Sequence, residues 1–320
     1  MIRVLRSRLL QATAVVLVVV TTCFALIRLA PGDPFFAALE EPGVPPESAA
    51  LLREQFGYDR PLTDQYLRFL GGVVRGDLGW SHSRGRPVSA VLREVLPNTA
   101  LLMASALLLG LVGGVLLGAW QGWRAESRLA AATDRLALVV LSIPEFVVAL
   151  LLALGPALAW GLFPIGGMRT EFGPRGLAGI VDVLHHLALP AFTLALVLAA
   201  IVARHQRAAM RAVRDAEFVR ASRARGTRER TIARHALRNA LVPVLTLTGV
   251  ILPSLLGGAV LVERIFAWPG MGRTMVDAVL GRDYPLVAGG VIVSSIGVVV
   301  ATLIADLAVL WADPRLRTRL

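Results

Sequence analysis

Residues 99–120 read TALLMASALLLGLVGGVLLGAW, and this stretch decides the fold of the chain. It contains no charged side chain and is long enough to cross a membrane, since a helix needs about 20 apolar residues to span about 30 Å of hydrocarbon. Its glycines, Gly110, Gly113, Gly114 and Gly118, indicate close contact with another helix. The stretch therefore predicts a membrane-spanning helix packed tightly inside a bundle.

Five further apolar blocks lie on either side of this stretch. Composition agrees with a membrane protein, because 56% of the chain is hydrophobic and only 17% is charged, whereas soluble domains carry about 25% charged residues. We therefore expect an all-α integral membrane protein with six transmembrane helices. The other five blocks are residues 9–30, 129–154, 186–203, 241–262 and 286–311.

The first block could be read as a signal peptide, because three arginines precede its apolar centre. Its apolar run is too long for that, and no small-residue cleavage pattern follows it. Instead, Pro31-Gly32-Asp33-Pro34 ends the helix. We expect an uncleaved first span in which Cys23, the single cysteine, is a buried thiol rather than a lipid-modified one.

Residues 31–97 differ in kind from the spans. They carry acidic residues, prolines and glycine-containing turns, and two stretches, 48–56 and 62–74, have apolar residues at helical spacing. We expect a small external helical subdomain here. The predicted organisation is a cytoplasmic N-terminus with the first span (1–30), this subdomain (31–97), and a five-span core (98–320) that contains a cytoplasmic loop at 204–238.

Arginine is distributed unevenly between the loops. On one side, the N-terminus, residues 121–135, the 204–238 loop and the C-terminus hold 20 arginines and 6 acidic residues, while the loops of the other side hold 12 and 14. Cytoplasmic loops carry the excess of basic residues. Both termini and the 204–238 loop are therefore expected in the cytoplasm of a multi-pass inner-membrane protein. The net charge of +11 then reflects topology and predicts no nucleic-acid partner.

The residue types also exclude some chemistry. There is no lysine among the 33 basic residues, so the chain has neither a P-loop lysine nor a Schiff-base amine. The spans show no nucleophile–base constellation, and His185-His186 lack a third metal ligand nearby. We expect no enzyme activity, no catalytic residue, no metal site and no cofactor on this chain. Paired charges at mid-membrane and an inverted repeat, which a secondary transporter would favour, are not seen.

The 204–238 loop carries the strongest functional signal. Two short helices are expected, over 215–225 and 228–240, with a break at Gly226. The second has an apolar stripe and, on another face, arginines spaced by four residues, which suits either anionic lipid head groups or a protein partner. The small residues Ala221 and Ser222 with Gly226 favour close approach by a partner.

This loop resembles the ATPase-coupling loop of binding-protein-dependent ABC importer permeases, and is most similar to the dipeptide, oligopeptide and nickel subfamily. The resemblance rests on 217–226 (EFVRASRARG) and 235–243 (HALRNALVP), and it covers nearly the whole chain. The broad importer signature opens with Glu-Ala-Ala, whereas this chain has Arg220-Ala221-Ser222. Contacts that the signature glutamate makes in other importers are therefore not expected of Arg220. Further matching motifs, in order, are 28–34 (RLAPGDP), 57–62 (GYDRPL), 75–81 (RGDLGWS), 96–99 (LPNT), 141–144 (LSIP), 262–272 (VERIFAWPGMG), 282–285 (RDYP) and 313–315 (DPR).

The resemblance implies a type I importer fold in which two permeases enclose the translocation path. In this family the second permease is a paralogue of the first. Two ATPase domains would carry ATP and Mg²⁺, and an external substrate-binding protein would deliver peptides; nickel is the alternative cargo, and an ion-driven secondary transporter is the alternative class. The residues expected to contact the ATPases are Glu217, Phe218, Val219, Ala221, Ser222 and Gly226. The residues expected on the translocation path are Ser142, Pro144 and Glu145.

Overall fold

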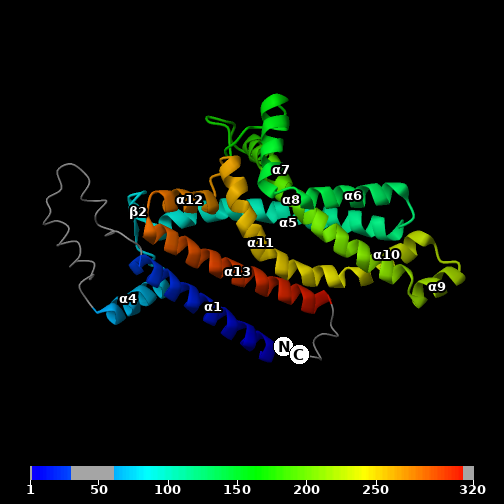
Figure 1. The fold of residues 1–320 in the computed structure, drawn as a ribbon, viewed down its shortest axis with the longest axis horizontal. Coiled ribbons are helices and arrows are strands. Elements are labelled where there is room, and N and C mark those ends of the chain that lie inside the picture. Colours follow the sequence, from blue (N-terminus) through cyan, green and yellow to red (C-terminus); the bar gives the residue numbers. More distant parts are fainter. Residues whose placement is uncertain (1, 30–60, 313–320) are drawn as a thin grey trace. The chain divides into compact units, whose positions relative to one another are not determined.

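The computed structural model describes residues 2–29 and 61–312, which are almost entirely helical (Figure 1). A two-residue antiparallel pair, β1 (Trp80–Ser81) and β2 (Arg86–Pro87), is the only sheet among them. The helix predicted over 62–74 is confirmed as α4, and the one predicted over 48–56 lies outside the described residues. The helical elements are α1 (Ile2–Leu29), α4 (Leu62–Arg75), α5 (Val88–Trp123), α6 (Arg128–Ser142), α7 (Glu145–Leu152), the π-helical η1 (Ala153–Ala159), α8 (Leu177–Arg214), α9 (Glu217–Ala224), α10 (Glu229–Ala240), α11 (Val242–Ile265), α12 (Met271–Leu280) and α13 (Tyr284–Ala312).

The all-α membrane fold is confirmed. Within the described residues, four helices are long and apolar enough to cross a membrane: α1, α5, α8 and α13. A fifth span is made if the bent pair of α6 with α7 and η1 counts as one. The block predicted over 241–262 is helical as α11, and the count of six spans stays a prediction.

The third block does not form the single helix that we expected over 129–154. Instead, α6 ends at Ser142 and α7 begins at Glu145, and the two are bent by 102°. The cause is Pro144, which lacks an N–H group and disfavours helical backbone in the residue before it. Ile143 accordingly has an extended conformation, with φ −92° and ψ 127°.

The chain divides into two compact units, described separately below. The larger contains Leu96–Arg273 together with the chain from Val300, and the smaller contains Ile2–Val95 with Thr274–Val299. Helix α8 is the centre of the larger unit, where it packs against α6, α7, α10 and α11 (Figure 1). Its apolar core includes Leu102, Leu194, Val262, Phe266 and Trp268, each at most 1% exposed.

A row of glycines on α5 allows that helix to contact α8 closely. The glycines are four residues apart, as are the side chains they meet, so the two helices match over four rungs. A methyl group on Gly110 would stand 2.6 Å from Leu198 Cδ2, and one on Gly114 would stand 2.6 Å from Val202 Cβ. The next rungs set Gly118 against the side chain of Gln206 and the backbone of Ala203, and Gly122 against Met210. We call these four rungs the α5–α8 contact.

The contact predicted for Gly110, Gly114 and Gly118 is thus confirmed, whereas Gly113 makes no such contact within the described chain. A methyl group on Gly113 would have no atom of the described chain within 4 Å. Gly113 lies one residue before Gly114, and one residue turns a helix by about 100°, so it points away from α8.

The smaller unit is organised around α1, α4 and the start of α13. The rings of Phe24 and Tyr66 meet edge to face with centroids 5.4 Å apart. Next to α13, the buried carboxylate of Asp283 accepts hydrogen bonds from the hydroxyls of Ser81 (2.6 Å) and Ser83 (2.7 Å). Burial acts to raise the pKa of Asp283, but these bonds and two from backbone N–H groups outweigh it, so the pKa is lowered. Two of the quoted sequence motifs, 75–81 and 282–285, therefore meet here.

Candidate functional site

The segment expected to dock a partner consists of α9, a turn and α10, as the sequence predicts. The break falls at Gly226, whose φ of 71° lies in the left-handed region that side-chain-bearing residues avoid at a cost of about 1–2 kcal/mol. No atom of the described residues lies within 4 Å of where a methyl group on Gly226 would stand. The glycine is therefore required by the backbone of the turn and not by close packing inside this chain.

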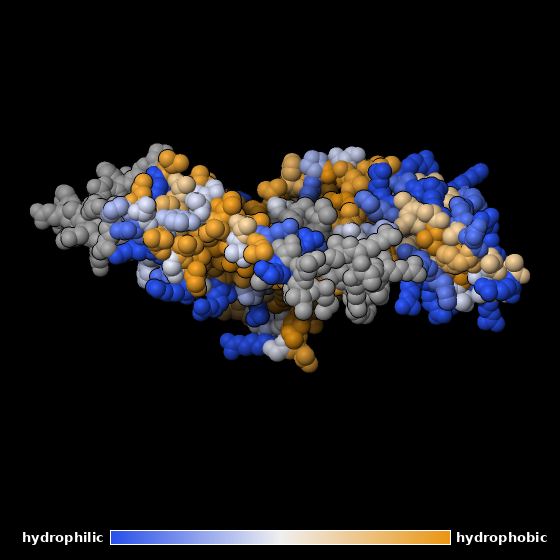
Figure 2. Space-filling model, turned by 90° about the horizontal axis from the view of Figure 1, so that it is seen from below, coloured by the Kyte–Doolittle hydropathy of each residue, from blue (hydrophilic) through white to orange (hydrophobic). Residues whose placement is uncertain are grey.

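Helix α10 lies against the end of α8 through the apolar stripe that the sequence predicts. Ile232, Ala236 and Ala240 are at most 2% exposed, and Ala236 and Ala240 share a core cluster with Met210 of α8. The arginines on the opposite face of α10 are exposed. In Figure 2 the end of the larger unit that carries α9 and α10 is accordingly rich in hydrophilic residues.

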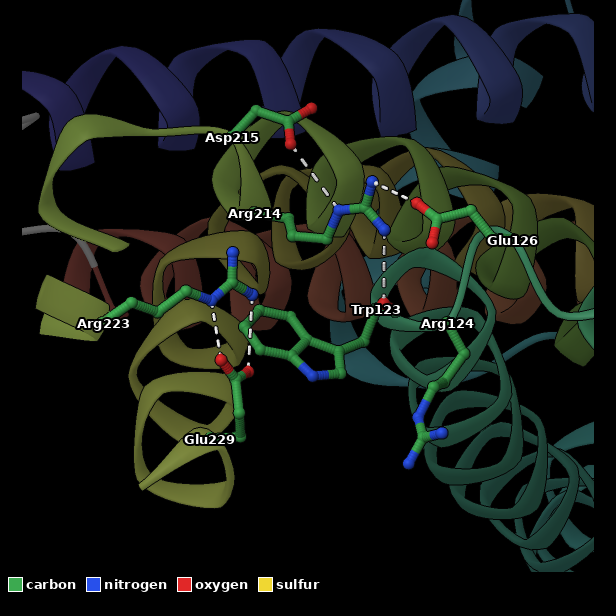
Figure 3. Close-up of a pocket in the computed structure, with 7 residues that line it drawn as sticks. All are labelled: Trp123, Arg124, Glu126, Arg214, Asp215, Arg223 and Glu229. Carbon is green, nitrogen blue, oxygen red and sulfur yellow. Dashed lines mark hydrogen bonds and ion pairs between the residues drawn. The ribbon is translucent and has the colours of Figure 1, made fainter. Parts of the chain in front are cut away.

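A polar pocket of about 430 Å³ lies where the ends of α5 and α8 meet α9 and α10 (Figure 3). Arg214, near the end of α8, donates to Glu126 Oε1 at 3.3 Å and to the carbonyl of Trp123 at 3.4 Å. Its Nε lies 3.6 Å from Asp215 Oδ1. One guanidinium thus ties the end of α8 to the end of α5 and to the turn that follows α5.

A second guanidinium in the same pocket ties α9 to α10 and α5. Arg223 Nε donates to Glu229 Oε1 at 2.6 Å, and a further nitrogen donates to Oε2 at 3.4 Å. The guanidinium carbon of Arg223 also lies 5.5 Å from the centre of the Trp123 ring, within cation–π range. The hydrogen bond from Arg223 lowers the pKa of the Glu229 carboxyl. We call Trp123, Arg214, Arg223 and Glu229 the joint.

The predicted docking residues divide by exposure. Glu217, Phe218 and Ala221 are exposed on α9, and the Phe218 side chain is 41% exposed. Ser222 is half-buried and donates to the Phe218 carbonyl at 2.7 Å. Val219 is fully buried, so it holds α9 to its own chain and offers no surface to a partner.

Sequence reasoning missed the joint. Trp123 lies just beyond the predicted end of the second span, and Arg223 and Glu229 lie among many charged residues of the same loop. Their six-residue separation across a break is not a helical spacing, so no periodic signal links them. The one available hint was a tryptophan at a span end, which also fits an ordinary interfacial position.

The predicted path residues lie together at the bend between α6 and α7. Ser142 is exposed and donates to the Leu138 carbonyl at 2.9 Å. Pro144 is the residue immediately before α7, and Glu145 is its first residue. The Glu145 carboxylate lies against Gly258 of α11, where a methyl group would stand 2.7 Å from Oε1.

Two other motifs from the sequence form a buried cluster in the larger unit. Thr99 donates to Glu263 Oε1 at 2.6 Å and accepts from the Met271 N–H at 2.7 Å. The Trp268 ring N–H donates to the Asn98 carbonyl at 3.0 Å. The motifs 96–99 and 262–272, distant in sequence, are therefore one structural feature.

Both histidines of the 185–186 pair have local contacts. His185 Nε2 lies 3.0 Å from the Leu162 carbonyl, and His186 Nδ1 lies 2.8 Å from the Asp182 carbonyl. No group of three or more His, Cys, Asp or Glu side chains that could hold a metal occurs in the part of the chain that the structure describes.

The fold and this site define a class: an all-helical, multi-span membrane permease component. Residues 110–318 match the family described as binding-protein-dependent transport system inner membrane component, and residues 1–103 match the corresponding N-terminal family. The chain belongs to this family of ABC importer permeases.

Curated relatives cover nearly all of the chain. It is 37% identical to an oligopeptide transport system permease protein of Bacillus subtilis over 97% of each chain. It is 39% identical to a putative peptide permease protein of Brucella suis over 99% of each. It is 33% identical to a dipeptide transport system permease protein of Escherichia coli over 92% of each. The resemblance stated from the sequence motifs is confirmed.

Proposed function

We propose that this chain is one permease subunit of an ATP-driven importer of peptides and forms half of the translocation path. The names of its full-length relatives, which are permease proteins of oligopeptide and dipeptide transport systems, support this cargo. The expected partners are a second, paralogous permease, two ATPase domains and an external substrate-binding protein. ATP and Mg²⁺ would bind to the ATPases, since this chain has no lysine for a P-loop.

The proposed orientation places both termini and the α9–α10 segment in the cytoplasm. The arginine excess of the loops on that side supports it. The exposed arginines of α10 would then face the cytoplasm or the anionic head groups of the inner leaflet.

In the proposed mechanism, closure of the ATPases displaces α9. The Arg223–Glu229 pair binds α9 to α10, and Arg223 links α9 to Trp123 at the end of α5, while Val219 is buried against the rest of the chain. Met210 and Arg214 link α10 and the joint to the end of α8. Because α5 and α8 are in close contact over four rungs, they would move as one body, and the displacement would reach the membrane. Two states biased by ligands at both ends would then alternate.

The observation that carries the proposal is the exposed face of α9, which presents Phe218. The helix itself is fixed by the joint, through the contacts of Arg223 with Glu229 and Trp123. We expect Phe218→Ser to lower co-purification of the ATPase subunits and to uncouple ATP hydrolysis from uptake. Leu129, an apolar side chain that is 62% exposed on α6, provides the control, and Leu129→Ser should leave both unchanged. Equal ATPase recovery with Phe218→Ser and the parent chain would refute the docking role.

The energy source and the cargo are tested together in liposomes that contain the complete complex. Uptake of a labelled peptide should require ATP and the binding protein, and should survive collapse of ion gradients. Uptake that follows an ion gradient without ATP would favour the secondary-transporter alternative. Binding of Ni²⁺ but not peptide by the external protein would favour the nickel alternative.

A further inference from the structure

The bend between α6 and α7 has the chemistry of a cation-binding site. A carboxylate within a membrane span is costly unless it faces water or a partner charge. The Glu145 side chain is only partly exposed, and it makes no hydrogen bond or ion pair to any residue that the structure describes. Its negative charge therefore has no partner among the described residues.

The obvious structural role for Glu145 is not used. An acidic residue in the first turn of a helix can accept hydrogen bonds from free N–H groups there. No side chain caps the start of α7 in this way. The carboxylate instead lies against Gly258 of α11, so close that a larger residue at that position would displace it.

The backbone at the bend adds negative character. The C-terminal end of a helix carries a partial negative charge on its free carbonyl groups, and α6 ends at Ser142, three residues before Glu145. Non-helical backbone at membrane depth is tolerated where it lines a water-filled cavity or is buried in protein. Broken spans in other transporters bind ligands with such helix ends.

We propose that this bend is a subsite on the translocation path that binds the terminal ammonium group of a peptide. The ammonium has three donors, which the Glu145 carboxylate and the carbonyls at the end of α6 could accept. A divalent metal fits less well, because the described residues offer no cluster of three ligating side chains. This inference rests on the proposed peptide transport and names the part of the cargo that the path recognises.

The first experiment asks whether the site is reached from water. Cys23 is the single cysteine, so Cys23→Ala gives a thiol-free background for Glu145→Cys in the complete complex. We expect Glu145→Cys to react with a water-soluble methanethiosulfonate at least about tenfold faster than Leu151→Cys, which is on the same helix and 59% exposed. An equal or slower rate would overturn the proposal whether or not the complex imports peptides.

The second experiment changes only the charge at the site. On Glu145→Cys, a sulfonatoethyl reagent restores a negative charge and an aminoethyl reagent of similar size adds a positive one. We expect peptide uptake to be higher after the first by roughly tenfold or more, as hydrogen bonds to charged groups allow. The same effect from both reagents would overturn the ammonium site.

A third variant guards against a folding defect. Glu145→Gln keeps the shape of the side chain, and it should slow peptide uptake in a complex that assembles with the same thermal midpoint as the parent. Glu145→Asp should retain uptake. Equal uptake by Glu145→Gln and the parent chain would contradict the subsite. If the parent complex imports no peptide, the proposed function itself fails, and the labelling rates still report whether the bend is open to water.

Discussion

The α5–α8 contact and the bend between α6 and α7 are built on opposite principles. In the contact, glycines bring two unbroken helices together until side chain meets backbone, as at Gly118 and Ala203. At the bend, a proline interrupts the helix and an acidic side chain occupies the place beside a facing glycine. Tight packing transmits displacement, because packed cores do not deform continuously. The bend instead brings a carboxylate and the end of α6 together at a break between two apolar helices.

The largest effect is expected where the contact is closest. Gly118→Leu would force a side chain into the backbone of Ala203, and overpacking of this kind costs about 3 kcal/mol. We expect loss of the folded complex or a sharp fall in its thermal midpoint, measured on detergent-purified protein. Gly113→Leu places the same side chain on the same helix, away from α8, and should leave the midpoint nearly unchanged. Similar losses from both would mean that the contact is not closely packed.

The turn at Gly226, between α9 and α10, is the next most sensitive position. Gly226→Val should destabilise the α9–α10 segment by about 1–2 kcal/mol, because a β-branched residue is strained at a φ of 71°. Gly226→Asn should be milder, since asparagine tolerates this backbone. Hydrogen exchange of the segment measures the difference. If Asn and Val behave alike and both abolish ATPase binding, bulk at the partner surface would be the cause instead.

One methyl group on Gly258 would displace the Glu145 carboxylate at the bend. Gly258→Ala should shift the Glu145 carboxylate, with a cost below about 1 kcal/mol because the displaced atoms end a flexible side chain. We therefore expect a small change in thermal midpoint and a clear fall in peptide uptake. Gly257→Ala is the matched control, because a methyl group there meets no atom of the described chain within 4 Å. A larger change in midpoint than in uptake would make the position structural.

The smallest effect is expected at the ion pair of the joint. Glu229→Gln should loosen α9 by less than about 1 kcal/mol, as exposed pairs generally do, and should raise the ATP hydrolysed per peptide imported. Because the folded pKa of Glu229 is lowered, the contribution is present above the usual carboxyl pKa and is lost as pH falls through the folded value. After division by the intrinsic exchange rate at each pH, the protection of α9 should fall in acid in the parent chain and change little with pH in the variant.

Local pattern predicted much of the fold. The apolar stripe of α10 is buried as its spacing indicates, with Ile232 and Ala236 at most 2% exposed. The break at Gly226 and the glycine face of α5 also follow from residue type and spacing. These features depend on neighbours within one helix, which the sequence displays directly.

What the sequence did not reveal depends on contacts between distant segments. Glycine spacing indicates a helix contact but does not name Leu198 and Val202 as its other side. The block 129–154 was expected to be one unbroken helix, and this is wrong because the apolar run outweighed Pro144 in the prediction. Arg223, Glu229 and Trp123 come together only once three helices are placed, and no periodicity joins them.

The four rungs of the α5–α8 contact also restrict how the length of this chain can change. Each rung depends on a step of four residues in both helices at once, from Gly110 to Gly122 and from Leu198 to Met210. Deleting one residue between two rungs would rotate everything beyond it by about 100°, so that side chains would replace glycines at the remaining rungs. We therefore expect insertions and deletions to be excluded from these two stretches and tolerated in connections such as residues 161–176.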